Sequence, residues 1–336
     1  MVVSNQSMDN YKNFNHIKIH TQYSICEGAL RINDLAEFCK KNKIKCVGLS
    51  DTTNLCGALE FSENLSKIGT QPIIGTQVNF KFADQIGLLP LIATSEESYK
   101  SIIEMSSNSY LKNDGMSEPH CNFKDLTAIS KDIIILSGTV NGLVGKLFDK
   151  GLSNEIEEIY KFLKKSINDN FYIEIQRHND HNEKSFEEFN LEISKKLDIP
   201  IIATNEVFYL DKEMYEAHDA LICIGNKTYI NEKNRLKYSN QHYLKSDEEM
   251  KEIFSDLPEA LENNYNLFYK CKFKPRSSKP VLPNISSDKG GDADQNLIDD
   301  SMTGLNEKFL KLFNIEEKDL LENENYKKYK ARLDHE

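Results

Sequence analysis

The chain has 336 residues, of which 28% are charged and 39% are hydrophobic, and its formal net charge is -11 at pH 7. This length and composition are typical of a large α/β domain with an appendage, or of two domains. Acidic and basic residues are interspersed. The net negative charge does not fit a basic protein whose surface binds nucleic acid.

The sequence carries no sign of export or membrane insertion. The first dozen residues are polar, and the chain has no run of about 18 apolar residues. The seven cysteines are scattered without C-x-x-C spacing, and their odd number means that at least one cannot pair within the chain. We therefore expect a cytoplasmic protein without a membrane partner, whose cysteines are buried, reduced thiols.

Short apolar runs alternate with amphipathic segments up to about residue 210. The runs predict strands over Ile17–His20, Cys46–Ser50, Pro72–Phe80, Leu88–Thr94, Asp132–Ser137, Phe171–Gln176 and Ile199–Phe208. The segments between them predict helices over Ile32–Lys43, Gly57–Ile68, Ser95–Tyr110, Asn154–Ile167 and Glu183–Leu197. This alternation indicates a mainly parallel sheet of the α/β class. Seven runs favour a distorted (β/α)7 TIM-like barrel, with an open doubly wound sheet as the alternative.

Several predicted strands end in polar residues, namely Ser50-Asp51, Gln77, Ser137-Gly138-Thr139, Glu174 and Gln176, and Asn205-Glu206. In parallel α/β barrels the carboxyl ends of the strands converge on the functional mouth. Taken singly, Asp51 and Ser137 are better explained as caps of the following helices. Taken together, the pattern favours a shared mouth.

The pattern changes beyond Leu210. Ser246 and Glu249 form a capping box at the start of a helix, and Pro258 marks the first turn of another. Residues 274–295 are rich in proline, glycine and aspartate and predict a linker. Leu297–Leu312 and Tyr326–Leu333 predict two more helices. We expect residues 1–14 to be disordered and residues 296–336 to begin an incomplete domain, so that the chain is the front part of something longer.

Seven short motifs carry a family resemblance by their order and spacing. They are HIKIHTQYS at 16–24, LSDTTNLCG at 49–57, KIGTQPIIG at 67–75, ILSG at 135–138, ATNE at 203–206, SDEEM at 246–250 and LPEA at 257–260. With these motifs the chain resembles the amino-terminal region of bacterial DNA polymerase III alpha subunits. The resemblance implies a barrel of the PHP (polymerase and histidinol phosphatase) type over residues 15–273, a linker at 274–295 and the start of the palm at 296–336.

In metal-bearing members of this family, the PHP mouth holds a cluster of divalent ions that can hydrolyse phosphoester bonds. The resemblance implies that His20, Glu27 and, in place of an aspartate, Glu206 remain from the ligand set. The other ligand positions carry Lys18, Thr52, Gln77, Leu88, Thr139 and Phe208.

These replacements predict a degenerate metal site. Clustered divalent cations need several anionic or imidazole ligands, whereas threonine, leucine and phenylalanine supply none and Lys18 adds a positive charge. His20, Glu27 and Glu206 could in principle hold one weak ion. We expect no catalytic residue and no metal in this chain, with Lys18 paired to Glu27 or Glu206.

The resemblance further implies part of a DNA-directed DNA polymerase, a nucleotidyltransferase of bacterial DNA replication. Its partners would be the remainder of the alpha subunit, DNA through the full-length enzyme, and a proofreading exonuclease that docks on this domain. The Mg²⁺ ions of the polymerase site belong to palm aspartates. No Asp-x-Asp on a predicted strand precedes Glu336, so we expect the chain alone to be inactive.

Two alternatives stay open. One is a residual metal-dependent 3'–5' exonuclease or phosphoesterase that uses His20, Glu27 and Glu206. The other is a free-standing scaffold from a split or truncated gene.

Some other residues have the chemistry of ligands or of nucleic-acid contacts. His178 and His181 have His-x-x-His spacing, but their polar setting predicts solvated histidines on an exposed loop. His16 and His218 are expected to have structural roles. A basic group could contact a nucleic-acid backbone or form a solvated face; it consists of Lys233, Arg235, Lys237, Arg276 and Lys279.

Overall fold

The computed structural model describes residues 13–113, 115–128, 132–281 and 292–336. The chain divides into two compact units, with the division between Ser277 and Ser278. The disorder predicted for residues 1–14 falls mostly on residues 1–12, which lie outside the described residues.

In the described part of the chain, nine strands form one sheet. They are β1 (His16–Ile19), β2 (Cys46–Thr52), β3 (Gln71–Phe82), β4 (Gln85–Ile92), β5 (Cys121–Asn122), β6 (Ile134–Leu136), β7 (Phe171–Ile175), β8 (Ile201–Ala203) and β9 (Glu206–Val207). The order across the sheet is β8-β7-β6-β4-β3-β2-β1-β9, and β5 pairs with β3 beside this path.

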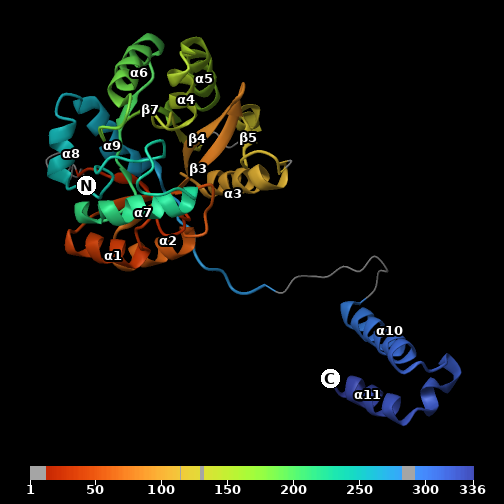
Figure 1. Ribbon diagram of the computed structural model, residues 1–336. Coiled ribbons are helices and arrows are strands. Elements are labelled where there is room, and N and C mark those ends of the chain that lie inside the picture. The colour runs from red at the N-terminus through yellow and green to blue at the C-terminus, as the bar shows by residue number, and fades with distance from the viewer. Residues whose placement is uncertain (1–12, 114, 129–131, 282–291) are drawn as a thin grey trace, which may run out of the picture. The chain divides into compact units, whose positions relative to one another are not determined.

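The two outermost strands of this order are neighbours in the sequence. β8 ends at Ala203 and β9 begins at Glu206, so only two residues separate the opposite ends of the sheet. Because consecutive Cα atoms are about 3.8 Å apart, the sheet must curl until its ends nearly meet. Figure 1 shows this curled sheet inside a ring of helices. The predicted barrel is confirmed, and the open doubly wound alternative is wrong.

One predicted strand runs against the others. The pairs that join β9, β1, β2 and β3, and those that join β6, β7 and β8, are parallel. β4 is antiparallel to both β3 and β6. It follows β3 through a tight turn at Ala83, whose φ is 50°, and so short a connection can only join antiparallel strands.

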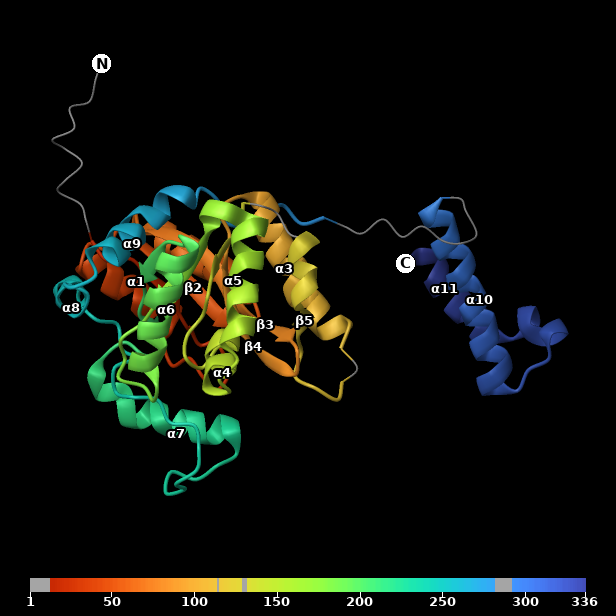
Figure 2. The same ribbon diagram turned by 90° about the horizontal axis from the view of Figure 1, so that it is seen from above.

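The helices of the first unit lie outside the barrel. They are α1 (Ile32–Lys41), α2 (Ala58–Lys67), α3 (Glu96–Leu111), α4 (Leu143–Asp149), α5 (Ser153–Ile167), α6 (Glu183–Leu197), α7 (Tyr215–Asn226), α8 (Asp247–Ile253) and α9 (Pro258–Lys270). Figure 1 shows α1 and α2 on one side and α4, α5 and α6 on the opposite side. In Figure 2, α7 and α9 lie at opposite ends of the barrel. The predicted capping box of Ser246 and Glu249 begins α8, and Pro258 begins α9.

The second unit is a small helical hairpin. It consists of α10 (Ala293–Phe313), the 3-10 helix η6 (Glu317–Glu322) and α11 (Glu324–His335), which pack through Phe309, Leu320 and Tyr326. Both predicted helices of this region are confirmed and are longer than predicted. In the predicted linker, residues 282–291 lie outside the described residues, and residues 274–277 belong to the first unit. The assignment of residues 296–336 to a palm stays a prediction.

Two predictions from composition concern membranes and thiols. Within the described ranges, the structure has no helix with the length and apolar character that a bilayer crossing requires. All seven cysteines are free thiols. Five are buried as predicted, but Cys26 and Cys56 are exposed because they lie in loops at the surface.

Candidate functional site

The strand register assembles polar side chains at the mouth of the barrel. Lys18 on β1 lies opposite Glu206 on β9. On the other side of β1, Thr52 at the end of β2 lies opposite Gln77 on β3. The shared mouth that the polar strand ends predicted therefore exists, and its most distant members, Lys18 and Glu206, are 188 residues apart in the sequence.

Lys18 lies at the centre of this site. Its side chain is fully buried, and its Nζ lies 3.2 Å from Glu174 Oε1 and 3.2 Å from Glu206 Oε1. Neither contact has the geometry of a hydrogen bond, so the attraction is mainly between charges. The predicted pair with Glu206 is present. The second partner is Glu174, which we predicted to lie at the mouth but not to pair with Lys18.

The charges of this cluster stabilise one another. Burial alone would lower the pKa of Lys18, but the carboxylates of Glu174 and Glu206 outweigh it and raise that pKa above its usual value. For Glu206, burial would raise the pKa, but Lys18 and His20 hold it well below its usual range. The ammonium and the Glu206 carboxylate are therefore both charged at neutral pH.

Glu174 is held from its other side by polar neighbours. Thr204 Oγ1 donates to Glu174 Oε1, and Gln176 Nε2 donates to the same oxygen at 2.8 Å. Thr204 lies in the two-residue link between β8 and β9, so this bond ties the closure of the barrel to β7.

His20 joins the two retained carboxylates through opposite ring nitrogens. Its Nε2 lies 3.1 Å from Glu206 Oε1, whereas its Nδ1 lies 3.7 Å from Glu27 Oε2. Burial lowers the pKa of His20, but the hydrogen bond to Glu206 and the charge of Glu27 raise this pKa by more than burial lowers it. The net shift is therefore upward. His20 also packs on the ring of Phe208, with 4.5 Å between the ring centroids.

This geometry does not fit a metal held by His20, Glu27 and Glu206. A single ion binds one imidazole nitrogen along its in-plane lone pair, so it cannot also reach a carboxylate on the far side of the same ring. Two positions to which the family resemblance assigns ligands supply hydrogen bonds instead. Gln77 Nε2 donates to Glu206 Oε1 at 2.7 Å, and Thr52 Oγ1 donates to Glu27 Oε2.

Asp51 shapes the loop beneath this cluster rather than capping a helix. Its Oδ1 accepts from the backbone N–H of Thr21 at 2.7 Å and from Ser24 Oγ at 2.8 Å. The helix that follows, α2, begins after Gly57. Asp51 thus fixes the loop that carries Glu27, and its burial raises the pKa of its carboxyl.

The mouth opens to solvent only at its rim. A cavity of about 490 Å³ is lined by Glu27, Thr52 and Leu88, together with Tyr238. Beside Glu174 and Thr139 there is a void of about 10 Å³, which is barely enough for one water. The ion-pair centre is therefore closed off, and only Glu27 and Thr52 of the cluster line the open cavity.

His178 was predicted to be solvated, and this prediction is wrong. The loop after β7 folds back, so that His178 is buried and its ring stacks on His242 with centroids 4.1 Å apart and planes within 3°. His242 Nε2 lies 3.1 Å from Asp180 Oδ2. His181 alone is exposed as predicted. Local sequence patterns do not indicate this burial, because His242 lies in a different loop, 64 residues away.

His178, Asp180 and His242 are the one group of three metal-ligand side chains that converges within the described residues. The two imidazole rings are stacked face to face, so their lone pairs lie in separate parallel planes and cannot both point at one ion. His178 Nε2 also accepts from the backbone N–H of Glu206. The arrangement suits a packed, neutral imidazole, and burial lowers the pKa of His178 well below its usual value.

His16 and His218 have structural surroundings. His16 Nε2 contacts the carbonyl of Lys245 at 2.9 Å, and His218 Nε2 contacts the carbonyl of Glu27 at 2.9 Å. Burial lowers the pKa of each histidine to about 4. Both are therefore neutral at neutral pH.

Lys18→Met is expected to lower the free energy of unfolding by about 3–5 kcal/mol, because it leaves two buried carboxylates without their cation. Urea unfolding at neutral pH measures this change. The matched control is Lys161→Met, which removes an ammonium that is 60% exposed and paired with Glu157; its expected cost is within about 0.5 kcal/mol. Equal losses in the two variants would contradict the role of Lys18.

The pH dependence of stability reports on His16. Because its pKa is about 4 in the folded state and about 6.5 in the unfolded state, the unfolded state binds more protons between these values. Stability from this group is thus lost as pH falls through this window, by about 2 kcal/mol between about pH 7 and about pH 5. His16→Gln should show a correspondingly shallower loss in urea titrations at the two pH values. His181→Gln, at an exposed position, should keep the wild-type slope, and a slope unchanged in His16→Gln would refute this linkage.

The comparisons with known proteins agree with the motifs. The family model of the PHP domain matches residues 16–178. The DNA polymerase III subunit alpha of Rickettsia conorii is 36% identical over 288 residues, which cover 84% of this chain and 24% of that protein. Its counterpart in Rickettsia felis is 35% identical over 328 residues, covering 96% and 27%, and that of Vibrio cholerae is 32% identical over 305 residues, covering 89% and 26%.

Among solved structures, a metal-dependent phosphoesterase from Bifidobacterium adolescentis shares 15% identity, with a TM-score of 0.33, and the match covers 57% of this chain and 86% of that one. The chain spans about a quarter of the length of the polymerase subunits that it matches. The resemblance seen in the motifs is confirmed: residues 16–178 match the PHP domain, and most of the chain is homologous to part of DNA polymerase III alpha subunits.

Proposed function

We propose that this chain is the amino-terminal PHP region of a bacterial replicative DNA polymerase, and that its phosphoesterase centre has become a structural ion-pair cluster. The observation that carries this proposal is the position of Lys18. Its ammonium occupies the middle of the mouth, 3.2 Å from each of two carboxylates that would otherwise attract a cation. A fixed amine holds those carboxylates but supplies neither Lewis acidity nor an activated water.

In this proposal the chain contributes support rather than chemistry. Template-directed nucleotide addition would belong to the full-length protein, whose palm aspartates hold Mg²⁺. The barrel would buttress the palm and present a docking surface to the proofreading exonuclease.

Exposed apolar residues support a docking surface beside the mouth. Ile224 at the end of α7 is 70% exposed, and Tyr229 and Ile230 in the following loop are 74% and 62% exposed. Clustered apolar exposure of this kind is typical of protein interaction sites.

The residual phosphoesterase is the alternative, and metal-dependent hydrolysis tests it directly. The purified chain should hold no stoichiometric zinc or manganese by mass spectrometry. It should not hydrolyse single-stranded DNA or a phosphate monoester when either metal is added, because Glu27 and Glu206 lie on opposite sides of the His20 ring.

The control for this test is His20→Ala, which should leave any background hydrolysis unchanged. Turnover that needs added metal, disappears on chelation and is abolished in His20→Ala would establish the phosphoesterase and overturn the proposal.

Docking of the exonuclease is tested by pull-down with the tagged chain and the cognate exonuclease subunit. The wild-type chain should retain the subunit, and Ile224→Asp with Ile230→Asp should reduce retention at least about tenfold, since each change places a charge in an apolar contact. Leu312→Asp, at a 75% exposed position of α10, is the matched control and should bind normally. Retention that is unchanged in the double variant would exclude this surface, and no retention by the wild-type chain would exclude docking on this chain.

A further inference from the structure

A large groove lies at the end of the barrel opposite the mouth. Its volume is about 1110 Å³, and its walls come from the end of α2, the first turns of α3, the end of α9 and the segment that follows α9. The amino end of β3 also lines it, so it is far from the carboxyl ends that form the mouth. The groove exceeds the roughly 300–1,000 Å³ of most small-molecule pockets, which favours an extended ligand.

The groove carries an excess of positive charge in an acidic protein. Four basic side chains line it, Lys100, Lys272, Lys274 and Arg276, against one acidic side chain, Glu96. Lys100 is paired with Glu96 at 2.7 Å. Within the described residues the other three cations have no ion-pair partner. Their uncompensated charge contrasts with the net charge of -11 of the whole chain.

Hydrogen bonds fix the backbone that carries these three cations. Gln71 Nε2 donates to the carbonyl of Cys271 at 2.8 Å, and the backbone N–H of Lys272 donates to the carbonyl of Thr94 at 3.0 Å. The carbonyl of Pro275 accepts from Ser62 Oγ at 2.7 Å. The backbone that carries the cations is thus ordered before any ligand arrives, which lowers the entropy cost of binding.

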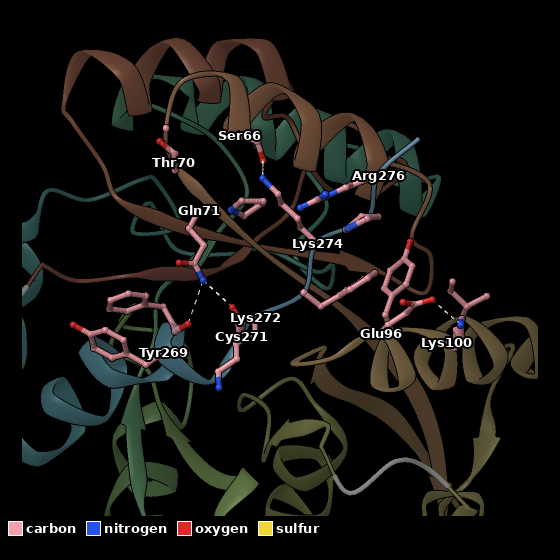
Figure 3. A pocket seen from close by; sticks show the side chains of 17 residues that line it. Ser66, Thr70, Gln71, Glu96, Lys100, Tyr269, Cys271, Lys272, Lys274 and Arg276 are labelled. Atoms are coloured by element: carbon pink, nitrogen blue, oxygen red, sulfur yellow. Dashed lines mark hydrogen bonds and ion pairs between the residues drawn. The ribbon is translucent and has the colours of Figure 1, made fainter. Parts of the chain in front are cut away.

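Two of the cations lie side by side. Lys274 Nζ donates to Ser66 Oγ at 2.8 Å, a neutral partner that leaves its charge uncompensated. Figure 3 shows the Arg276 side chain next to that of Lys274, on the α2 side of the hollow. Two neighbouring cations without a carboxylate match the charge of a phosphate, which accepts several hydrogen bonds from such groups.

Aromatic rings form two walls of the groove. On the α9 side, Phe268 and Tyr269 lie with ring centroids 3.9 Å apart, and Tyr269 is 57% exposed. On the α3 side, Tyr99 and Phe273 lie with centroids 5.1 Å apart. In Figure 3, Tyr269 stands across the hollow from Glu96 and Lys100. An exposed ring beside a basic strip is a platform on which nucleobases stack.

We propose that this groove binds single-stranded nucleic acid, with Lys274 and Arg276 on its phosphates and Tyr269 under a base. An acidic peptide would satisfy the cations, but it has no flat π-face for the exposed ring. A single strand satisfies both features at once and needs no sequence preference. This inference does not depend on the state of the metal site, and it stands or falls separately from the proposed function.

The test is fluorescence anisotropy with the full chain and a labelled oligothymidylate of about 20 nucleotides. The wild-type chain should bind at about 50 mM salt and lose affinity at about 200 mM, as phosphate contacts require. Lys274→Gln with Arg276→Gln should weaken binding and lower the slope of log affinity against log salt by about 1.4. Tyr269→Ala should weaken binding about fivefold or more.

Matched controls separate the groove from general charge. Lys40→Gln with Lys41→Gln removes two exposed cations at the end of α1, and Tyr229→Ala removes a ring that is 74% exposed; both should bind as the wild type does. Arg276→Gln alone removes a side chain without an ion-pair partner, so it tests the groove even if the double variant folds poorly.

Three results would overturn the inference. The first is no binding by the wild-type chain at low salt. The second is equal loss of affinity in the groove variants and their controls. The third is a polyglutamate peptide that competes as well as unlabelled oligothymidylate, because the groove would then recognise charge alone.

Discussion

The buried contact of Lys18 with Glu174 and Glu206 is the constraint around which the mouth of this barrel is built. Two carboxylates that face each other inside a protein repel unless a cation lies between them. In a metal centre that cation is an exchangeable ion, whereas here it is covalently part of β1. The amine cannot be removed by a chelator, but it also cannot polarise a phosphate or lower the pKa of a water. In our proposal, Lys18 therefore keeps the electrostatic role of a metal and loses its chemical role.

The neighbouring side chains complement this fixed cation. Gln77 and Thr52 donate hydrogen bonds to Glu206 and Glu27, so each carboxylate has a partner without any ion. His20 contacts Glu206 with one nitrogen and approaches Glu27 with the other. Since a buried carboxylate without a partner is costly, these bonds explain how the cluster stays charged inside the barrel. Glu206 and Glu27 thus lie on opposite sides of the His20 ring.

The two ends of the barrel differ in chemistry. The mouth is filled by compensated charges and opens only through a rim at Glu27 and Thr52. The opposite end carries uncompensated cations and one exposed aromatic ring, Tyr269. Charges that are paired with each other, as at the mouth, stabilise the fold. Unpaired cations on an ordered backbone, as in the groove, can attract an anionic ligand. The former catalytic end is thus the structural one in our proposal, and the far end is the one that presents a charged surface.

The sequence by itself determined the strand–helix alternation, the barrel and the presence of a lysine where a metal ligand is expected, because these depend on local periodicity and on side-chain chemistry. Only the tertiary structure decided that Glu174 is a partner of Lys18, since β7 and β1 meet through the curvature of the sheet. It also buried His178 against His242 and turned β4 antiparallel, through contacts between distant segments and a tight turn at Ala83. The gathering of Lys274, Arg276 and Tyr269 around one groove likewise depends on how the end of α9 and the segment after it lie against α2 and α3. Such contacts leave no periodic trace in the chain, because they join residues whose separation in sequence carries no information about their distance in space.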